Sequence, residues 1–350
     1  MRGAGLRRAE RVAAAAQTAC LLDVTAPKPG NVSRGRDLPG LTYRDFVLSA
    51  YAIGPAFRGA GRERVGRLIL EAVRATRRHV RTNTNLGIVL LLAPLARAAS
   101  RTGGTLRDRL RRVLLDLDVR DARDAYRAIR LAGAGGLGRV ARQDVGATPD
   151  VSLLECMRLA GERDSIAREY VTGYSITFGL GLETLRRLRD RHVPLPQSIS
   201  QTHLTLLAAV PDSLLARRHG RAISRRVAVE ARRVLRAGGY LTARGTRLAE
   251  RLDTRLRTVR PPRNPGTTAD LTVASLFVWL LEEADRGLRS ARSMRRGSSR
   301  APRTRSRPAS RAAPPRAAAS PRPRPRRRRT RPDPTRTARR RGRRLPSAAR

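Results

Sequence analysis

Residues 62–80, R-E-R-V-G-R-L-I-L-E-A-V-R-A-T-R-R-H-V, carry the pattern that decides the fold class. Their apolar side chains recur every three or four positions with charged residues between them, which is typical of an amphipathic α-helix. The same period recurs along most of the chain to about residue 290, and no stretch shows the sustained alternation of a half-buried β-strand. The sequence therefore predicts an all-α fold.

Other stretches with this period predict the rest of a helical bundle. We expect helices over 6–24, 42–57, 86–99, 150–162, 164–190, 199–217, 222–237, 242–258 and 268–289, and two shorter ones before the glycine-rich loop 133–146. Three helices have an N-cap residue followed three positions later by an aspartate, which is the spacing of a capping box. These N-cap residues are Thr42, Thr105 and Asp118.

Positive charge is concentrated near the end of the chain. The 350 residues have a formal net charge of +47, and residues 291–350, with 23 arginines and one aspartate, hold +22 of it. This segment has 10 of the 22 prolines and almost no large apolar residue, so it cannot bury enough surface to offset the entropy of ordering. We expect one helical domain over 1–290 and a disordered basic tail over 291–350. The tail either binds nucleic acid non-specifically through counterion release or has no partner.

The cysteines and the apolar runs bear on location. Cys20 and Cys156 lie in helical patterns without framework spacing, which indicates free thiols in a reducing compartment. The longest apolar run, 88–96, is too short to span a membrane, and the arginine-rich N-terminus lacks the apolar core of a signal peptide. We expect a cytoplasmic protein that does not contact the membrane.

The only lysine of the chain, Lys28, lies in the stretch A-P-K-P-G-N at 26–31. The two prolines fix their own φ angles and keep the residues before them out of the helical region, and Gly30 permits a turn with positive φ. A chain that otherwise uses arginine keeps a compact ammonium group here. We expect a stiff loop that presents one cation, and the alternative is a plain turn with a solvated lysine.

Two further polar stretches have the same character, T-N-T-N-L-G at 82–87 and N-P-G-T-T-A-D at 264–270. Each places backbone N–H groups near an expected helix start, where the helix dipole favours a phosphate group. Asp37 and Asp270 are carboxylates in such surroundings and could hold Mg²⁺. One such loop is usually a capped helix, but three together indicate an anionic ligand, most simply a nucleotide.

Several common catalytic motifs are absent. A Walker A loop needs a lysine after glycine, and the only lysine lies between prolines. G-A-G-G-L-G at 133–138 matches the dinucleotide-binding pattern, but it follows an expected helix instead of a strand, which argues against a Rossmann fold. The metalloprotease, C-x-x-C and G-x-S-x-G motifs are missing, and the four histidines lack metal-ligand spacing.

The polar motifs in combination resemble the triphosphoribosyl-dephospho-CoA synthase family, over about residues 10–288. They are A-P-K-P-G-N-V-S-R (26–34), G-R-D-L (35–38), T-N-T-N-L-G (82–87), G-G-L-G-R-V (135–140) and N-P-G-T-T-A-D-L (264–271). The resemblance implies an all-α transferase that moves the triphosphoribosyl group of ATP to the 2′-hydroxyl of 3′-dephospho-CoA and releases adenine. The product would be a prosthetic-group precursor.

The resemblance also implies site residues. Lys28, Asp37 and Asp270 fall on or near residues of the family's motifs and would be catalytic, and the two aspartates would hold Mg²⁺ or one of them would act as the base. The resemblance and the polar loops together give the expected nucleotide-binding residues, which are Gly30, Asn31, Asn83, Thr84, Asn85, Gly87, Gly135, Gly136, Pro265, Gly266 and Thr267.

One motif departs from the family pattern. Asn85 and Leu86 stand where the family's N-T-H-K-G has His-Lys, which removes one acid/base group and one cation. Arg34, Arg36 or Arg168 could supply positive charge instead. This version resembles a branch associated with one-carbon cofactor biosynthesis, so a hydroxyl acceptor other than dephospho-CoA remains open. A third alternative is a non-enzymatic helical protein that binds nucleic acid.

Overall fold

The computed structural model describes the backbone of residues 2–298 and the side chains of residues 5–287. Within this range there is no β-strand, and the loop before residue 42 contains only two isolated β-bridges. The all-α prediction is confirmed. The predicted disordered tail, 291–350, lies almost wholly outside the described residues, so its disorder and its partner stay predictions.

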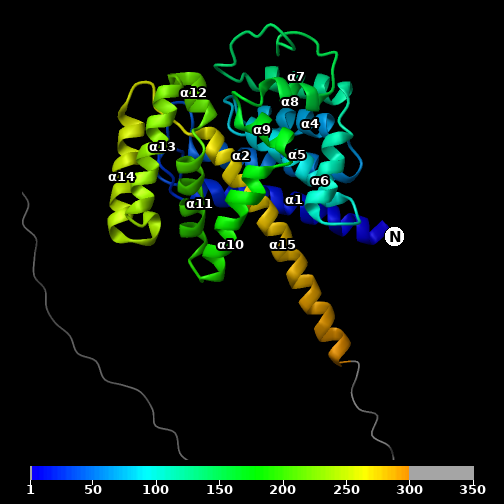
Figure 1. The fold of residues 1–350 in the computed structure, drawn as a ribbon. Coiled ribbons are helices and arrows are strands. Elements are labelled where there is room, and N and C mark those ends of the chain that lie inside the picture. Colours follow the sequence, from blue (N-terminus) through cyan, green and yellow to red (C-terminus); the bar gives the residue numbers. More distant parts are fainter. Residues whose placement is uncertain (1, 299–350) are drawn as a thin grey trace, which may run out of the picture. The chain divides into compact units, whose positions relative to one another are not determined.

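The helices are joined by short connections except at 26–42 and 133–152, which are long loops (Figure 1). The α-helices are α1 (Arg2–Thr25), α2 (Tyr43–Ala52), α3 (Gly54–Arg58), α4 (Val65–Arg77), α5 (Leu86–Ser100), α6 (Leu106–Leu115), α7 (Val119–Ala132), α8 (Leu153–Ala160), α9 (Ser165–Thr172), α10 (Glu183–Asp190), α11 (Leu195–Ala209), α12 (Ser213–His219), α13 (Arg221–Arg236), α14 (Ala243–Thr258) and α15 (Gly266–Ser298). Shorter elements are η1 (Gly59–Gly61), η2 (Thr177–Leu182) and η3 (Gly239–Leu241).

The three predicted capping boxes are all present. The side chains of Thr42, Thr105 and Asp118 each accept a hydrogen bond from the backbone three residues on, and the aspartate there accepts one in return. Each box satisfies backbone donors that a helix start otherwise leaves unpaired. The predicted starts of α2, α6 and α7 are therefore confirmed.

The helix predicted over 164–190 is interrupted. α9 ends at Gly173, which has a left-handed conformation (φ 63°). The buried carboxylate of Glu169 then accepts hydrogen bonds from the backbone N–H groups of Ile176 and Thr177, both at 2.8 Å. These two hydrogen bonds hold the turn that separates α9 from η2 and α10.

Two other predicted helices are also split. The helix predicted over 42–57 is divided at Ile53 into α2 and α3. The one predicted over 199–217 is divided into α11 and α12 at 210–212, where Pro211 lacks the N–H that a continuing helix needs. Asp212 caps α12 by accepting a hydrogen bond from the Leu215 N–H at 2.8 Å.

The helices pack as two groups on either side of α1 and α15, which contact each other (Figure 1). On one side, α4, α5 and α7 build the larger hydrophobic core together with α1 and α15, and on the other α11, α12, α13 and α14 enclose a smaller one. None of the helices among the described residues is long and apolar enough to span a membrane.

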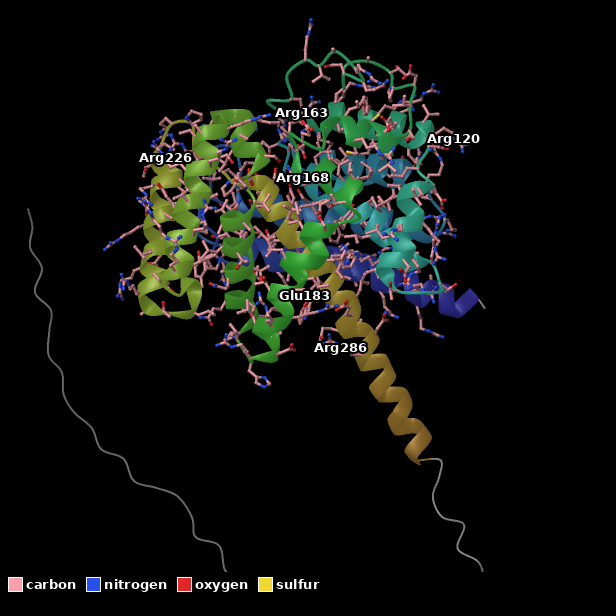
Figure 2. All side chains as sticks on the ribbon, viewed as in Figure 1. Arg120, Arg163, Arg168, Glu183, Arg226 and Arg286 are labelled. Carbon is pink, nitrogen blue, oxygen red and sulfur yellow. The ribbon has the colours of Figure 1, made fainter. Side chains whose placement is uncertain are left out.

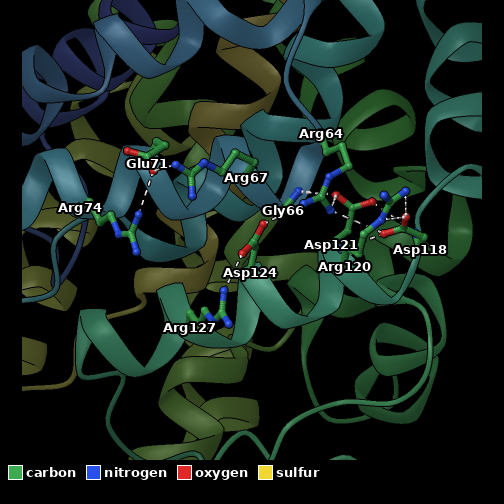
Figure 3. A network of polar contacts seen from close by, with 10 residues as sticks. All are labelled: Arg64, Gly66, Arg67, Glu71, Arg74, Asp118, Arg120, Asp121, Asp124 and Arg127. Atoms are coloured by element: carbon green, nitrogen blue, oxygen red, sulfur yellow. Dashed lines mark hydrogen bonds and ion pairs between the residues drawn. The ribbon is translucent and has the colours of Figure 1, made fainter.

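The contact between α4 and α7 shows how close the backbones come (Figure 3). Asp121 of α7 accepts a hydrogen bond from the Gly66 N–H of α4 at 2.7 Å. A Cβ atom at Gly66 would lie 2.4 Å from the Asp121 carbonyl oxygen, so only glycine fits there. Arg64 reaches across to Asp124 at 3.1 Å and adds an ion pair at the rim.

Candidate functional site

A cavity of about 290 Å³ lies where the polar loops predicted from the sequence meet. The predicted site residues that line it are Asn31, Asn83, Thr84, Asn85, Gly87, Gly135, Gly266, Thr267 and Asp270. α5 and α15 both begin at this cavity. Segments that are far apart in the sequence therefore form one site.

Five predicted site residues do not line the cavity. Lys28, Gly30, Gly136 and Pro265 lie beside residues that do, whereas Asp37 is not part of the lining. The Asp37 side chain is exposed and accepts a hydrogen bond from the Tyr43 N–H at 2.7 Å. This position argues against direct contact between Asp37 and a ligand in the cavity.

The loop at 26–31 packs against the loop at 263–265. The Asn31 side-chain amide donates to the Asn264 side-chain oxygen at 2.5 Å and to the Pro265 carbonyl at 3.4 Å. Gly30 has a φ of 76°, and a Cβ there would lie 2.7 Å from the Arg263 carbonyl oxygen. Gly30 therefore acts through the backbone, because no other residue allows this approach.

Asp253 of α14 fixes the same loop from outside the cavity. Its buried carboxylate accepts a hydrogen bond from the Gly30 N–H at 2.7 Å and pairs with Arg36 at 2.8 Å and Arg257 at 2.7 Å. Arg257 also donates to the backbone carbonyl of Asn31. Arg36 is one of the arginines expected to supply charge to a ligand, and it forms an ion pair with Asp253 instead.

Lys28 is buried instead of presented to solvent. Its side chain is 0% exposed, and its ammonium lies 3.1 Å from Oδ2 of Asp23, which is 8% exposed. The ammonium also donates to the carbonyls of Asp23 and Ala26, the latter at 3.2 Å. Burial lowers the pKa of Lys28 and raises the pKa of Asp23, and the attraction between the two opposes both changes.

The partner of Lys28, Asp23, lines the cavity, and the sequence reasoning missed it. Oδ1 of Asp23 is buried and has no hydrogen-bond partner among the described residues, and the same is true of Oδ1 of Asn31. Buried acceptors of this kind are rare in folded proteins and need an explanation. A ligand or an ion in the cavity would supply the missing partner.

The T-N-T-N-L-G loop places its side chains by local contacts. Asn83 accepts a hydrogen bond from the Leu86 N–H at 3.2 Å, Thr84 contacts Ser49 at 2.5 Å and Asn85 donates to Thr76 at 2.9 Å. The side-chain amide of Asn85 is thus engaged inside the protein. Leu86 lines the cavity, so an apolar side chain faces the ligand space at this position.

Asp270 lies against the start of α5. A Cβ at Gly87 would be 2.0 Å from Oδ2 of Asp270, so glycine is needed for the carboxylate to occupy its place. Burial, together with the nearby carboxylates of Asp212, Asp23 and Asp164, raises the pKa of Asp270 well above its usual range. A cation beside Asp270 would oppose this shift by favouring the ionised carboxylate.

Asp212 sets the start of α15. Its buried carboxylate accepts hydrogen bonds from the Thr268 N–H at 2.7 Å and the Thr268 hydroxyl at 2.8 Å, in addition to capping α12. Thr267 is held in turn by the Ser213 hydroxyl at 3.1 Å. The helix start that lines the cavity is thus rigidly positioned by residues outside it.

Four arginines line the cavity: Arg142, Arg163, Arg217 and Arg218. Arg217 pairs with Asp164, the N-cap residue of α9. No local signal distinguishes these arginines in a chain with 75 basic residues, so sequence reasoning could not select them. They place positive charge at the cavity, where Leu86 stands in place of one cation of the family motif.

Another part of the lining is mainly apolar. α7, the glycine-rich loop and α8 contribute Ile129, Leu137, Val140, Leu153 and Met157, and the same loop also adds Arg142, Gln143 and Asp144. A polar end and an apolar wall together suit a ligand that combines phosphates with a flat or apolar group.

Among the described residues, no group of three or more histidines, cysteines or acids is placed to hold a metal ion. Mg²⁺ is usually held by one or two carboxylates and by the phosphates of its substrate, so it needs no such group. Asp270 and the unpartnered Oδ1 of Asp23 are oxygen donors of the required kind at the cavity. The residues present fit Mg²⁺ in this limited sense.

Comparisons with known proteins identify relatives of the chain. Residues 9–288 match the family model CitG, ATP:dephospho-CoA triphosphoribosyl transferase. A crystal structure from Archaeoglobus fulgidus, of a protein provisionally assigned as triphosphoribosyl-dephospho-CoA synthase, is similar, with a TM-score of 0.52 and 28% sequence identity over 67% of this chain and 97% of that chain. No curated protein sequence matches significantly. The family match spans most of the chain, which belongs to the ATP:dephospho-CoA triphosphoribosyl transferase family.

Proposed function

We propose that the cavity binds ATP and transfers its triphosphoribosyl group to a hydroxyl of an acceptor, with 3′-dephospho-CoA as the acceptor and adenine as the leaving group. The observation that carries this proposal is the meeting of the three polar loops at one cavity with arginines and two helix starts. The family's activity agrees with it. The apolar wall provides a place for the adenine base.

The triphosphate is held at the polar end. Arg217 and Arg218 line this part of the cavity, as do Gly87 and Thr267 in the first turns of α5 and α15. Asn85, the N-cap residue of α5, makes no side-chain capping bond. Helix dipoles and guanidinium groups both favour phosphate oxygens, and both are preorganised here by the neighbouring loops.

Asp23 is the base. Displacement of adenine at C1′ passes through an oxocarbenium-like state, in which the acceptor hydroxyl must lose its proton as the new C–O bond forms. Oδ1 of Asp23 is free to take that proton, while Oδ2 is held by Lys28. Burial raises the pKa of Asp23 toward the range in which a carboxylate serves as a base near neutral pH. Lys28 acts by positioning this carboxylate.

Asp270 is the protein ligand of Mg²⁺. Asp270 would hold the ion, which would supply positive charge to neutralise the phosphates. The neighbouring carboxylates that raise the pKa of Asp270 also favour a cation beside it. Asp37, which lies outside the cavity, has no part in this proposal.

The acceptor is the least constrained part of the proposal. Leu86 at the cavity replaces a cation of the family motif, so a ligand there meets an apolar side chain. This observation keeps the one-carbon-cofactor alternative open, in which another hydroxyl compound replaces dephospho-CoA. The non-enzymatic alternative is set aside, because the family is one of transferases.

The test is release of adenine. The full chain is incubated with ATP and Mg²⁺, with and without 3′-dephospho-CoA, and adenine is measured by chromatography. We expect release that depends on dephospho-CoA and is strongly reduced in Asp23→Asn, with Asp190→Asn, an exposed carboxylate on α10, as the control. Adenine release that depends on a different hydroxyl compound would identify that compound as the acceptor. No adenine release with any acceptor would contradict the proposal.

A further inference from the structure

A second, smaller pocket of about 200 Å³ lies beside the cavity. Its lining comes from the start of α9, from α12 and from the first turn of α13. Four arginines line it: Arg163, Arg168, Arg221 and Arg225. Figure 2 labels Arg163 and Arg168 between the two groups of helices, with Arg226 of α13 apart from them.

The positive charge of this pocket is not neutralised within the described part of the chain. None of the four arginines has a carboxylate within ion-pair distance there, whereas most other acids of the protein, including Asp164, already pair with another arginine. The acids in the lining are Glu162 and Asp164, so arginine exceeds acid by two. All four arginine side chains are exposed, and an anion bound among them would neutralise positive charge that no acid of the described residues pairs with.

The floor of the pocket offers little other than these cations. The buried hydroxyl of Ser224 donates to the Asp212 carbonyl at 2.8 Å, and that of Ser213 is taken up by Thr267 and the Ser165 N–H. The arginines would therefore make the main contacts with an anion, because a guanidinium group can donate two parallel hydrogen bonds to phosphate oxygens. The pocket is smaller than the cavity, about 200 Å³ against about 290 Å³, and it suits one small anionic group better than a whole nucleotide.

The pocket and the cavity share part of their walls. Arg163 and Asp164 line both, and Asp164 is held in place by Arg217 of the cavity. A molecule with its anionic group in the pocket can therefore extend past Arg163 toward the cavity. The triphosphate of ATP already has its own cations and helix starts there.

We propose that this arginine pocket binds the diphosphate group of the acceptor while ATP occupies the cavity. The assignment rests on the proposed function, because it takes 3′-dephospho-CoA, which carries a diphosphate, as the acceptor. The pocket then holds the acceptor by its charge and leaves the rest of the molecule to reach Asp23. The pocket would recognise a diphosphate, and ATP also carries such a group in its phosphate chain. ATP is therefore the competing ligand for the pocket.

The first experiment measures binding without catalysis. Inorganic pyrophosphate is titrated by calorimetry into the full chain saturated with ATP, for wild type, Arg221→Ala, Arg225→Ala and Arg226→Ala. Arg226 is an exposed neighbour on α13 that does not line the pocket, and none of the three arginines makes a side-chain hydrogen bond in the described structure, so all three variants should fold. We expect roughly 10- to 100-fold weaker binding in Arg221→Ala and Arg225→Ala, and no change in Arg226→Ala.

The second experiment identifies the source of the phosphate. The KM values of ATP and dephospho-CoA are measured by adenine release in the same variants. A higher KM for dephospho-CoA with an unchanged KM for ATP supports the proposal, and a higher KM for ATP alone overturns it. Pyrophosphate binding that is equal in all four proteins also overturns it. If wild type releases no adenine with dephospho-CoA, the proposed function fails and so does the acceptor assignment, while the titration still shows whether the pocket binds a diphosphate.

Discussion

The Lys28–Asp23 pair allows a quantitative prediction for Lys28→Met. The ammonium is fully buried, lies 3.1 Å from Oδ2 of Asp23 and also donates to two backbone carbonyls. Removing it leaves a buried carboxylate without its counter-ion. Breaking a buried ion pair from one side costs about 3–5 kcal/mol, which is a large part of the roughly 5–15 kcal/mol that stabilises a typical domain.

The free energy of unfolding is measured by urea denaturation for wild type, Lys28→Met, Asp23→Leu and the double variant. Replacing both partners by apolar residues removes the unpaired charge, so we expect the double variant to recover most of the loss, with a coupling energy of about 2 kcal/mol or more. Adenine release should be lost in all three variants, because each removes or displaces the proposed base.

Two results would refute this reasoning. A loss below about 1 kcal/mol in Lys28→Met would mean that the pair is not a buried charge pair. A double variant as unstable as Lys28→Met would mean that packing of the lysine stem, and not its charge, accounts for the loss.

Three further changes have defined outcomes. The folded-state pKa of Asp270 is raised, so the stability that this residue contributes is complete below its unfolded pKa and is lost as the pH rises through its folded pKa. Asp270→Asn should therefore unfold at a higher denaturant concentration than wild type at neutral pH, show a flatter dependence of stability on pH, and lose Mg²⁺-dependent adenine release. A parallel pH dependence of stability in the two proteins would contradict this prediction. Gly87→Ala should displace the Asp270 carboxylate and lower kcat at least ten-fold, whereas Gly61→Ala, whose Cβ meets nothing closer than 3.6 Å, should keep wild-type kinetics. Gly66→Ala should lower stability by about 1–3 kcal/mol, since its Cβ would overlap the α7 backbone, and a Tm within one degree of wild type would show that α4 and α7 can separate without cost.

The parts of the fold that sequence reasoning found are those with local causes. The capping boxes at Thr42, Thr105 and Asp118 involve residues three positions apart, and a pattern of that length is visible in the chain itself. The break after α9 has a cause that is not visible in this way. It depends on the buried Glu169 carboxylate, which accepts from N–H groups seven and eight residues on.

The same difference between local and long-range causes explains which residues of the candidate site were predicted. The loops with Asn31, Asn83 and Gly266 were found because glycine, proline and asparagine mark them in the sequence. Asp23 was missed because it lies in an ordinary helical pattern, and only the fold of the following loop brings Lys28 back to it. Asp37 was included because of its motif, and its side chain is not among those that line the cavity.

The two-sided lining of the cavity has a consequence for altering the enzyme. Its polar end is built from loops clamped by Asp253 and Asp212, so substitutions there disturb several contacts at once. Its apolar wall comes from α7, the glycine-rich loop and α8, whose exchange for other apolar residues leaves those clamps untouched. Substitutions meant to change which nucleobase the donor carries are therefore best confined to side chains such as Leu137, Val140 and Met157, with the contacts to the phosphates left unchanged.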